Sequence, residues 1–189
     1  MKRALIWAVG GVFAVPLDTL HVATGVLSYR APSSWMPFAM QALWVIPLYA
    51  VAGIAMGFGH RHATIPLAGK PPTTTLLATL AGLGALAFAY ASSGLLQPWP
   101  IVALVAYVAV WLVIVAGVHR DARRSLVLHS LGTAAIGPLL EIAISSTGAF
   151  TYAHPDVAGV ALWLPGIYLN AAAASHLMDR HLMAREART

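Results

Sequence analysis

The chain has 189 residues, of which 59% are hydrophobic and only 9% are charged, with a formal net charge of +5. A soluble domain carries about 25% charged residues, so this composition excludes an ordinary soluble protein and predicts an integral membrane protein. The chain has no cysteine, which excludes disulfides, thiolate metal sites and cysteine nucleophiles. The positive charge requires no nucleic acid partner, because anionic lipid headgroups beside basic loops account for it.

Six apolar stretches are each close to the roughly 20 residues that cross the hydrocarbon core of a bilayer. They predict an all-α bundle of six transmembrane helices forming one membrane domain over residues 1–189. A basic start followed by an apolar run also resembles a secretory signal, but we interpret it as the first helix. The predicted spans are 4–27, 36–59, 73–92, 99–118, 126–148 and 160–178.

The basic residues predict the orientation of these spans. If the N-terminus is cytoplasmic, every Lys and Arg except Arg30 falls in a cytoplasmic segment, as the positive-inside rule requires. Both termini are therefore predicted to be cytoplasmic. We expect the bacterial cytoplasmic membrane, or the endoplasmic reticulum if the source is eukaryotic.

Ionisable side chains occur inside two of the predicted spans. Asp18 and His21 lie in the first, and Glu141 lies in the fifth at a similar depth, with Gln41 and Ser145 not far away. A charged group at the centre of a span costs about 2.5–3.5 kcal/mol, so such groups usually face protein or a water-filled cavity. The pattern predicts a polar layer that lines a cavity or links the helices. A simpler alternative is that Asp18 and His21 only pair with each other.

Further polar residues lie along the fifth span at four-residue spacing, so they share one slowly turning stripe of the helix. This stripe holds His129, Glu141 and Ser145, and Asn170 lies near the middle of the last span. Together with the loop and interfacial residues these are our candidates for contact with a lipid: Gln41, Trp44, His129, Glu141, Ser145, Trp163 and Asn170.

The remaining histidines predict neither a metal site nor a cofactor. His60 and His62 lie in a predicted loop without a carboxylate or thiolate partner, and we expect both to be solvated. His181 turns away from His176 and Asp179 at helical spacing, so this group is expected to be a solvated helix end. No catalytic or nucleotide-binding motif is present either, so no catalytic residue is predicted.

Small residues in the third and sixth spans predict close contact between helices. The runs are 82–85 and 171–175. We expect such faces to support self-association into a homo-oligomer, with a trimer among the options.

The hairpin between the last two spans carries a family resemblance. The stretch from Gly148 to Asp156, followed by Trp163-Leu164-Pro165, resembles the segment N-G-V-Y-Q-Y-T-S-P-D and then S-W-L-P-C of the Insig (insulin-induced gene) family. Two further matches support it. Asp121, Arg124 and Ser125 fall on the family's F-D-R-S-R-S loop, and the pattern A-W-W-V-P-P with its later glycine matches Ala42, Trp44, Val45, Pro47 and Gly57.

The resemblance implies a non-enzymatic six-helix protein that binds an oxysterol between its helices and holds other multi-span membrane proteins. It implies partner contact at Asp121 and the neighbouring Arg124. Gly117 and Val118 stand where the family has a tryptophan pair, so the expected ligand is a neutral lipid, either sterol-like or diacylglycerol-like. We expect a regulatory or scaffolding role.

Two other functions remain open from the residues alone. Asp18, His21 and Glu141 at one depth are also typical of an ion-coupled transporter or a proton relay. The same groups would serve as acid and base in an intramembrane enzyme that acts on lipids.

Overall fold

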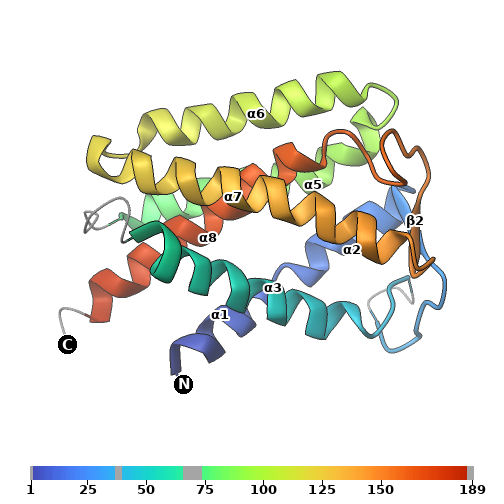
Figure 1. Ribbon diagram of the computed structural model, residues 1–189, viewed down its shortest axis with the longest axis horizontal. Helices are drawn as coiled ribbons and strands as arrows, with labels where there is room; N and C mark the ends of the chain where they lie inside the picture. The colour runs from blue at the N-terminus through green and yellow to red at the C-terminus, as the bar shows by residue number, and fades with distance from the viewer. Residues whose placement is uncertain (1, 37–39, 66–73, 187–189) are drawn as a thin grey trace.

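The computed structural model describes residues 2–36, 40–65 and 74–186. It is a helical bundle with one small sheet, which confirms the predicted fold class (Figure 1). The helices run back and forth between two ends of the molecule, and the start of the first helix and the end of the last lie away from the sheet. The elements in chain order are α1 (Lys2–Val12), α2 (Val15–Ala23), β1 (Leu27–Tyr29), α3 (Val45–Gly59), the π-helical turn η2 (His60–Thr64), α5 (Leu76–Leu96), α6 (Pro100–Gly117), α7 (Arg120–Ser145), β2 (Phe150–Tyr152) and α8 (Leu164–Glu186).

Several helix boundaries differ from the predicted spans. The second helix begins at Val45 rather than near 36, because the chain makes turns at 40–44 and Pro47 falls in the first helical turn, where proline is tolerated. Residues 37–39 lie outside the described part. The later helices extend beyond their apolar cores, since polar residues continue a helix past the membrane: α7 starts at Arg120 and α8 runs to Glu186.

The first predicted helix is divided in two. The amide of Ala14 bonds the carbonyl of Gly11 at 2.8 Å instead of the carbonyl four residues back. Pro16 has no amide hydrogen to continue the ladder, so α1 ends at Val12 and α2 starts at Val15. This places the polar residues of α2 on a separately oriented segment.

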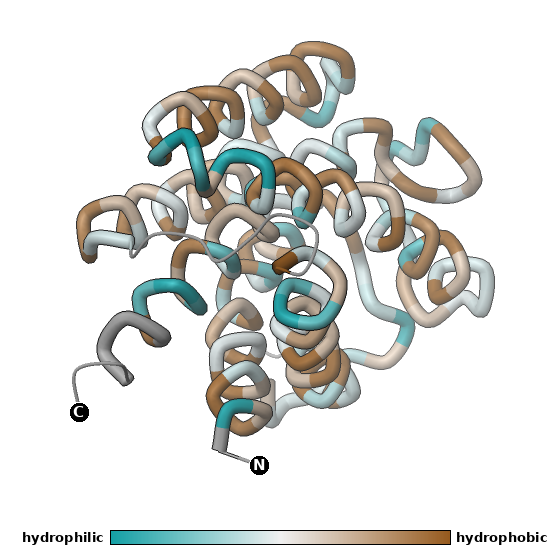
Figure 2. The backbone as a smooth tube through the Cα atoms, turned by 60° about the vertical axis from the view of Figure 1, so that its left-hand side comes forward, coloured by the Kyte–Doolittle hydropathy of each residue, from teal (hydrophilic) through white to brown (hydrophobic). Residues whose placement is uncertain are grey.

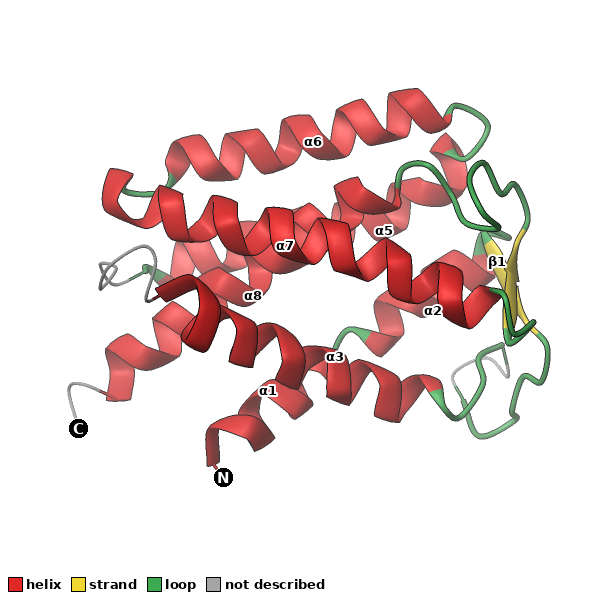
Figure 3. Ribbon diagram, in the orientation of Figure 1, coloured by secondary structure: helices red, strands yellow, loops and turns green. Residues whose placement is uncertain are grey.

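Helix α8 is the centre of the bundle and contacts α3, α5, α6 and α7 (Figures 1 and 3). Its small residues Ala172, Ala173 and Ala174 are buried. A Cβ on Gly82 of α5 would lie 2.9 Å from Leu177 Cδ1 and 3.3 Å from the Ala174 Cα. The predicted small faces therefore do make a close helix contact, within the chain.

Helices α1 and α3 touch through their backbones. A Cβ on Gly11 would lie 2.0 Å from the Tyr49 carbonyl oxygen, and one on Gly53 would lie 2.2 Å from the Trp7 carbonyl oxygen. A larger residue at either glycine would separate the two helices, which is the general reason for small residues at such crossings.

The two-stranded sheet joins the loop after α2 to the hairpin after α7. Strand β1 pairs with β2 in antiparallel register, Leu27 opposite Tyr152 and Tyr29 opposite Phe150. Gly148, with φ of 72°, makes the turn into β2 in a conformation that favours glycine. The pairing fixes both loops over one end of the bundle.

The outer surface is apolar over α5, α6 and α7. Figure 2 shows hydrophobic helices with hydrophilic segments near the chain ends. Large exposed side chains include Leu77, Leu80, Leu83, Phe88, Ile101, Val105, Val113, Leu131, Ile136 and Leu139. A soluble protein seldom exposes so much contiguous apolar surface, so these faces suit contact with lipid.

Four helical segments of the described chain are long and apolar enough to cross a membrane: 3–23, 76–96, 100–117 and 120–145. Helix α3, with 15 residues, is shorter, and α8 carries more polar residues. The count of six spans and the cytoplasmic placement of the termini stay predictions.

Candidate functional site

The first part of the candidate site is a hydrogen-bond network around Asp18 of α2. The Asp18 carboxyl accepts hydrogen bonds from the Tyr29 hydroxyl at 2.7 Å and from the Gln41 amide at 2.6 Å. Gln41 is fully buried; its amide also donates to the Val15 carbonyl at 3.2 Å, and its own oxygen accepts from the Thr19 hydroxyl at 2.9 Å. The network therefore ties the turn before α3 to α2.

The second part is centred on Glu141 of α7. Its carboxyl accepts hydrogen bonds from the hydroxyls of Tyr152 and of Tyr168, the latter at 2.7 Å. The position of Tyr168 depends on Gly137, one helical turn before Glu141, because a Cβ there would lie 2.3 Å from the tyrosine ring. The absence of a side chain at Gly137 thus lets α8 approach α7 closely enough for this bond.

The two networks lie close together. Asp18 and Glu141 are near enough to interact electrostatically, so the structure brings the two carboxyls into one region of the bundle. Between the helices that carry them, the Tyr90 hydroxyl lies 3.1 Å from that of Tyr49. His21 stacks on Tyr90 with ring centroids 4.4 Å apart.

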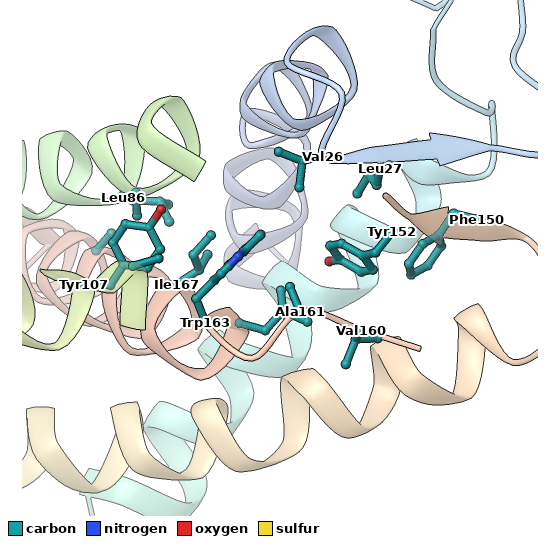
Figure 4. Packing of buried hydrophobic residues seen from close by; sticks show 14 residues of the cluster. Val26, Leu27, Leu86, Tyr107, Phe150, Tyr152, Val160, Ala161, Trp163 and Ile167 are labelled. Atoms are coloured by element: carbon teal, nitrogen blue, oxygen red, sulfur yellow. The ribbon is translucent and has the colours of Figure 1, made fainter. Parts of the chain in front are cut away.

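Aromatic rings enclose this polar group on the side of the sheet. Trp163 lies edge-on to Tyr152, with ring centroids 6.1 Å apart (Figure 4). It also lies edge-on to His21, with centroids 5.6 Å apart. Trp44 packs against Tyr29 and Phe150 with centroids 5.5 and 6.5 Å apart. Polar groups with such surroundings suit a ligand that is mostly apolar with a hydroxyl at one end.

The strand tyrosines act as hydrogen-bond donors over a wide pH range. Burial raises the pKa of the Tyr29 phenol, and the nearby Asp18 adds to the effect. Burial likewise raises the pKa of Tyr152, with Glu141 as the next cause. Both phenols therefore stay protonated and donate hydrogen bonds to the carboxyls.

Some predicted lipid-contact residues lie at this site and others do not. Gln41, Trp44 and Trp163 belong to the group around the two carboxyls. Ser145 lies at its edge, and its hydroxyl donates to the carbonyls of Phe150 and Gly159, each at 3.4 Å. Its contacts therefore hold the hairpin.

Asn170 and His129 lie elsewhere. Asn170 is buried and its amide donates to the carbonyls of Tyr107 at 3.0 Å and of Gly166 at 2.8 Å, so it joins α8 to α6. His129 lies twelve positions before Glu141 on α7, which is about 18 Å along the helix. Its ring is 5.3 Å from that of His60.

The simpler pairing of Asp18 with His21 is not what the structure has. Asp18 is bonded to Tyr29 and Gln41, while His21 is 3% exposed and its Nε2 has no hydrogen-bond partner. The two residues lie on one helix but contact different neighbours, because β1 and the turn before α3 supply the donors to Asp18.

The expectation of solvated histidines was wrong for two of them. His60 and His176 are each 0% exposed, and Asp179 is 4% exposed. The predicted loop at His60 is a π-helical turn continuing α3, and α8 buries His176 and Asp179 against it. His62 is exposed, as predicted. His181 does turn away from the other two, with its Nδ1 3.2 Å from the Thr74 carbonyl oxygen.

The predicted partner residues lie on the surface. Asp121 and Arg124 are both exposed in the first turns of α7, and Asp121 is 3.4 Å from the His119 ring nitrogen.

Sequence reasoning missed the tyrosines. Tyr29, Tyr90, Tyr152 and Tyr168 supply most of the hydroxyls at the site. The available signal was a set of tyrosines in or beside apolar segments at the depth of Asp18 and Glu141, since a buried phenol needs a partner.

No family model matches the chain. It is 28% identical to an INSIG protein homolog of Mycolicibacterium vanbaalenii, over 97% of this chain and 88% of that protein. The crystal structure of MvINS, the mycobacterial Insig homolog from Mycobacterium vanbaalenii, superposes with a TM-score of 0.77 at 25% identity and covers 98% of this chain and 96% of that one. The resemblance to the Insig family is confirmed. A cross-linked MvINS trimer has the same fold, with a TM-score of 0.78 at 24% identity over 98% of this chain and 96% of that one. This chain is therefore an Insig-like integral membrane protein.

Proposed function

We propose that this Insig-like chain is a non-enzymatic membrane protein that binds a neutral lipid, sterol-like or diacylglycerol-like, with the lipid hydroxyl at Glu141. The observation that carries the proposal is the bonding of Glu141. Its carboxyl is bonded by two uncharged phenols, of Tyr152 and Tyr168. The residue is half-buried, so part of the side chain stays open to a ligand. An uncharged hydroxyl suits such a site, because a third donor completes the carboxyl without bringing a charge out of water.

An apolar groove offers a place for the hydrocarbon tail of the proposed lipid. It has a volume of about 480 Å³, within the range of about 300–1,000 Å³ typical of ligand pockets. Val15 lines the groove and its carbonyl accepts the Gln41 hydrogen bond, so the groove adjoins the Asp18 network. Its lining residues are Ala8, Val9, Val12, Phe13, Val15, Pro16, Trp35, Met36 and Ile46.

The regulatory or scaffolding part of the proposal rests on the family resemblance and on the exposure of Asp121 and Arg124. These residues would contact another multi-span membrane protein. The trimer of MvINS supports a homo-oligomer for this chain as well. The hypothesis of an ion-coupled transporter through Asp18, His21 and Glu141 has no supporting observation among the relatives.

The test is native mass spectrometry of the protein in mild detergent, combined with lipid extraction from the same sample. We expect a co-purifying neutral lipid at one per chain, retained in Tyr107→Phe and lost in Glu141→Ala. Tyr107 is the matched control, because its hydroxyl lies 3.3 Å from that of Ser92, away from Glu141. The same spectrum counts the chains in the oligomer.

A wild-type protein that carries no lipid, and that binds no added sterol or diacylglycerol, would overturn the proposal. A second variant protects the test from a folding defect. Ala8→Trp places a large apolar side chain in the groove at a position whose own side chain belongs to neither carboxyl network, and should also reduce lipid occupancy.

A further inference from the structure

A second buried polar group lies near the other end of α7 from Glu141. Three imidazoles meet there: His60 from η2, His129 from α7 and His176 from α8. They are 0%, 5% and 0% exposed. Their ring centroids are 4.4 Å apart for His60 and His176, 5.3 Å for His60 and His129, and 6.4 Å for His129 and His176.

Four nitrogens of these three rings are buried without a hydrogen-bond partner. The Nε2 atoms of His60, His129 and His176 have no hydrogen-bond partner, and neither has the Nδ1 of His176. Buried polar atoms are nearly always bonded in folded proteins, so each exception needs an explanation. Four such nitrogens on three touching rings point to a shared ligand.

Asp179 supports one ring in a way that metal sites use. Its carboxylate lies 3.0 Å from the His60 Nδ1 and also accepts a hydrogen bond from the Trp7 indole at 3.1 Å. A carboxylate behind one nitrogen of a histidine fixes the proton there and leaves a lone pair on the other nitrogen, as in most metal-bound histidines. His60 is therefore left with an Nε2 lone pair that has no partner in the space it shares with the other two rings.

The backbone at His60 is itself unusual. The amide of Ile65 bonds the His60 carbonyl, which is the five-residue spacing of a π-helix. Such turns are rare and occur often at functional sites, because they re-aim a side chain that a regular α-helix would direct elsewhere.

We propose that His60, His129 and His176 bind a divalent transition-metal ion such as Zn²⁺, with Asp179 as a positioning residue. In a tetrahedral site with zinc–nitrogen bonds of about 2.0–2.1 Å, the ring centroids of two bound imidazoles are about 5 Å apart. The three separations lie on both sides of that value. Among the described residues, no group of three or more His, Cys, Asp or Glu side chains is already arranged to hold a metal ion. Binding therefore requires the imidazole rings to turn. His176 turns without breaking a hydrogen bond, since neither of its nitrogens makes one.

Two arginines set the electrostatics of this site. Arg61 is paired with Asp179 at 3.7 Å. The buried Arg180 is close enough for its positive charge to interact electrostatically with the His176 ring. The Arg180 charge opposes a bound cation, so the affinity depends on the three nitrogen bonds. Removing this charge should tighten metal binding, whereas it would weaken an anion site at the same place.

The experiment uses the full chain, purified without a histidine tag and stripped with a chelator. Zn²⁺ is titrated by calorimetry, and Co²⁺ is added to follow the visible absorption of tetrahedral cobalt. We expect one ion per chain, no binding in His176→Ala, and an unchanged affinity in His62→Ala. His62 is the matched control because it lies exposed in the same turn as His60. Asp179→Asn should weaken binding by about 10–100-fold, the usual effect of an outer partner.

Arg180→Gln decides between a cation and an anion and should strengthen Zn²⁺ binding. The proposal is overturned if the wild-type protein binds neither ion at one per chain, or if Arg180→Gln weakens binding. It is also overturned if His62→Ala loses as much affinity as His60→Ala. Because His176→Ala removes a buried ring, a rise in the wild-type melting temperature on adding Zn²⁺ provides a second readout that needs no variant.

Discussion

Replacement of Gln41 by leucine tests whether the Asp18 network stabilises the fold. The change keeps the size of the side chain and removes three hydrogen bonds, to Asp18 at 2.6 Å, to Val15 at 3.2 Å and from Thr19 at 2.9 Å. Hydrogen bonds between membrane helices average about 0.6 kcal/mol and reach about 1.7 kcal/mol. The hydrogen bond from Gln41 to Asp18 should contribute an energy near the upper end of this range, because its loss removes one of the donors to a buried carboxyl.

The sum for Gln41→Leu is therefore a loss of about 2–4 kcal/mol. For a chain of this size about 1 kcal/mol corresponds to 2–4 °C in melting temperature, so we expect a decrease of roughly 5–15 °C. The assay is thermal unfolding in detergent followed by tryptophan fluorescence. Tyr29→Phe, which removes only the 2.7 Å bond to Asp18, should cost about 1 kcal/mol.

The combination of both changes refines the test. Gln41 and Tyr29 donate to the same oxygen of Asp18, so their effects should not add. A melting temperature for Gln41→Leu equal to that of the wild type would show that the network contributes no stability. Strict additivity in the double variant would show that the two donors act independently, and either result would refute the reasoning.

Gly137→Ala places a Cβ where the Tyr168 ring lies, so we expect lower lipid occupancy and a loss of about 1–3 kcal/mol from overpacking; unchanged lipid content by mass spectrometry would contradict the close contact. Burial raises the pKa of Tyr29 and Tyr152 above the ordinary 10.0, so their stabilising contribution is complete below about pH 10 and decreases as the pH rises further. Unfolding between neutral pH and strong alkali should show this decrease, and it should be smaller in Tyr29→Phe; an equal decrease would argue against the assignment. Asp121→Ala changes an exposed surface residue, so the free energy of unfolding should change by no more than about 0.5 kcal/mol. A larger decrease, measured by thermal unfolding, would mean that Asp121 has a structural role.

Composition and periodicity were enough to predict a helical membrane protein, and the spacing of the hairpin residues was enough to predict its family. Both rest on local physics. An apolar run of about 20 residues has few alternatives to a membrane helix, and counting residues from the helix ends was enough to predict that Asp18 and Glu141 lie in one region of the bundle.

Tertiary contact decided what those residues do. Nothing in the sequence near Asp18 shows that Tyr29 and Gln41 bond it. Tyr29 is held by the β1–β2 pairing with a segment more than a hundred positions away, and Gln41 by the turn before α3. His60 and His176 looked like solvated residues because the sequence displays no partner beside them. They are buried because α8 crosses the end of α3, and only the packing of whole helices determines which distant side chains share that enclosed space.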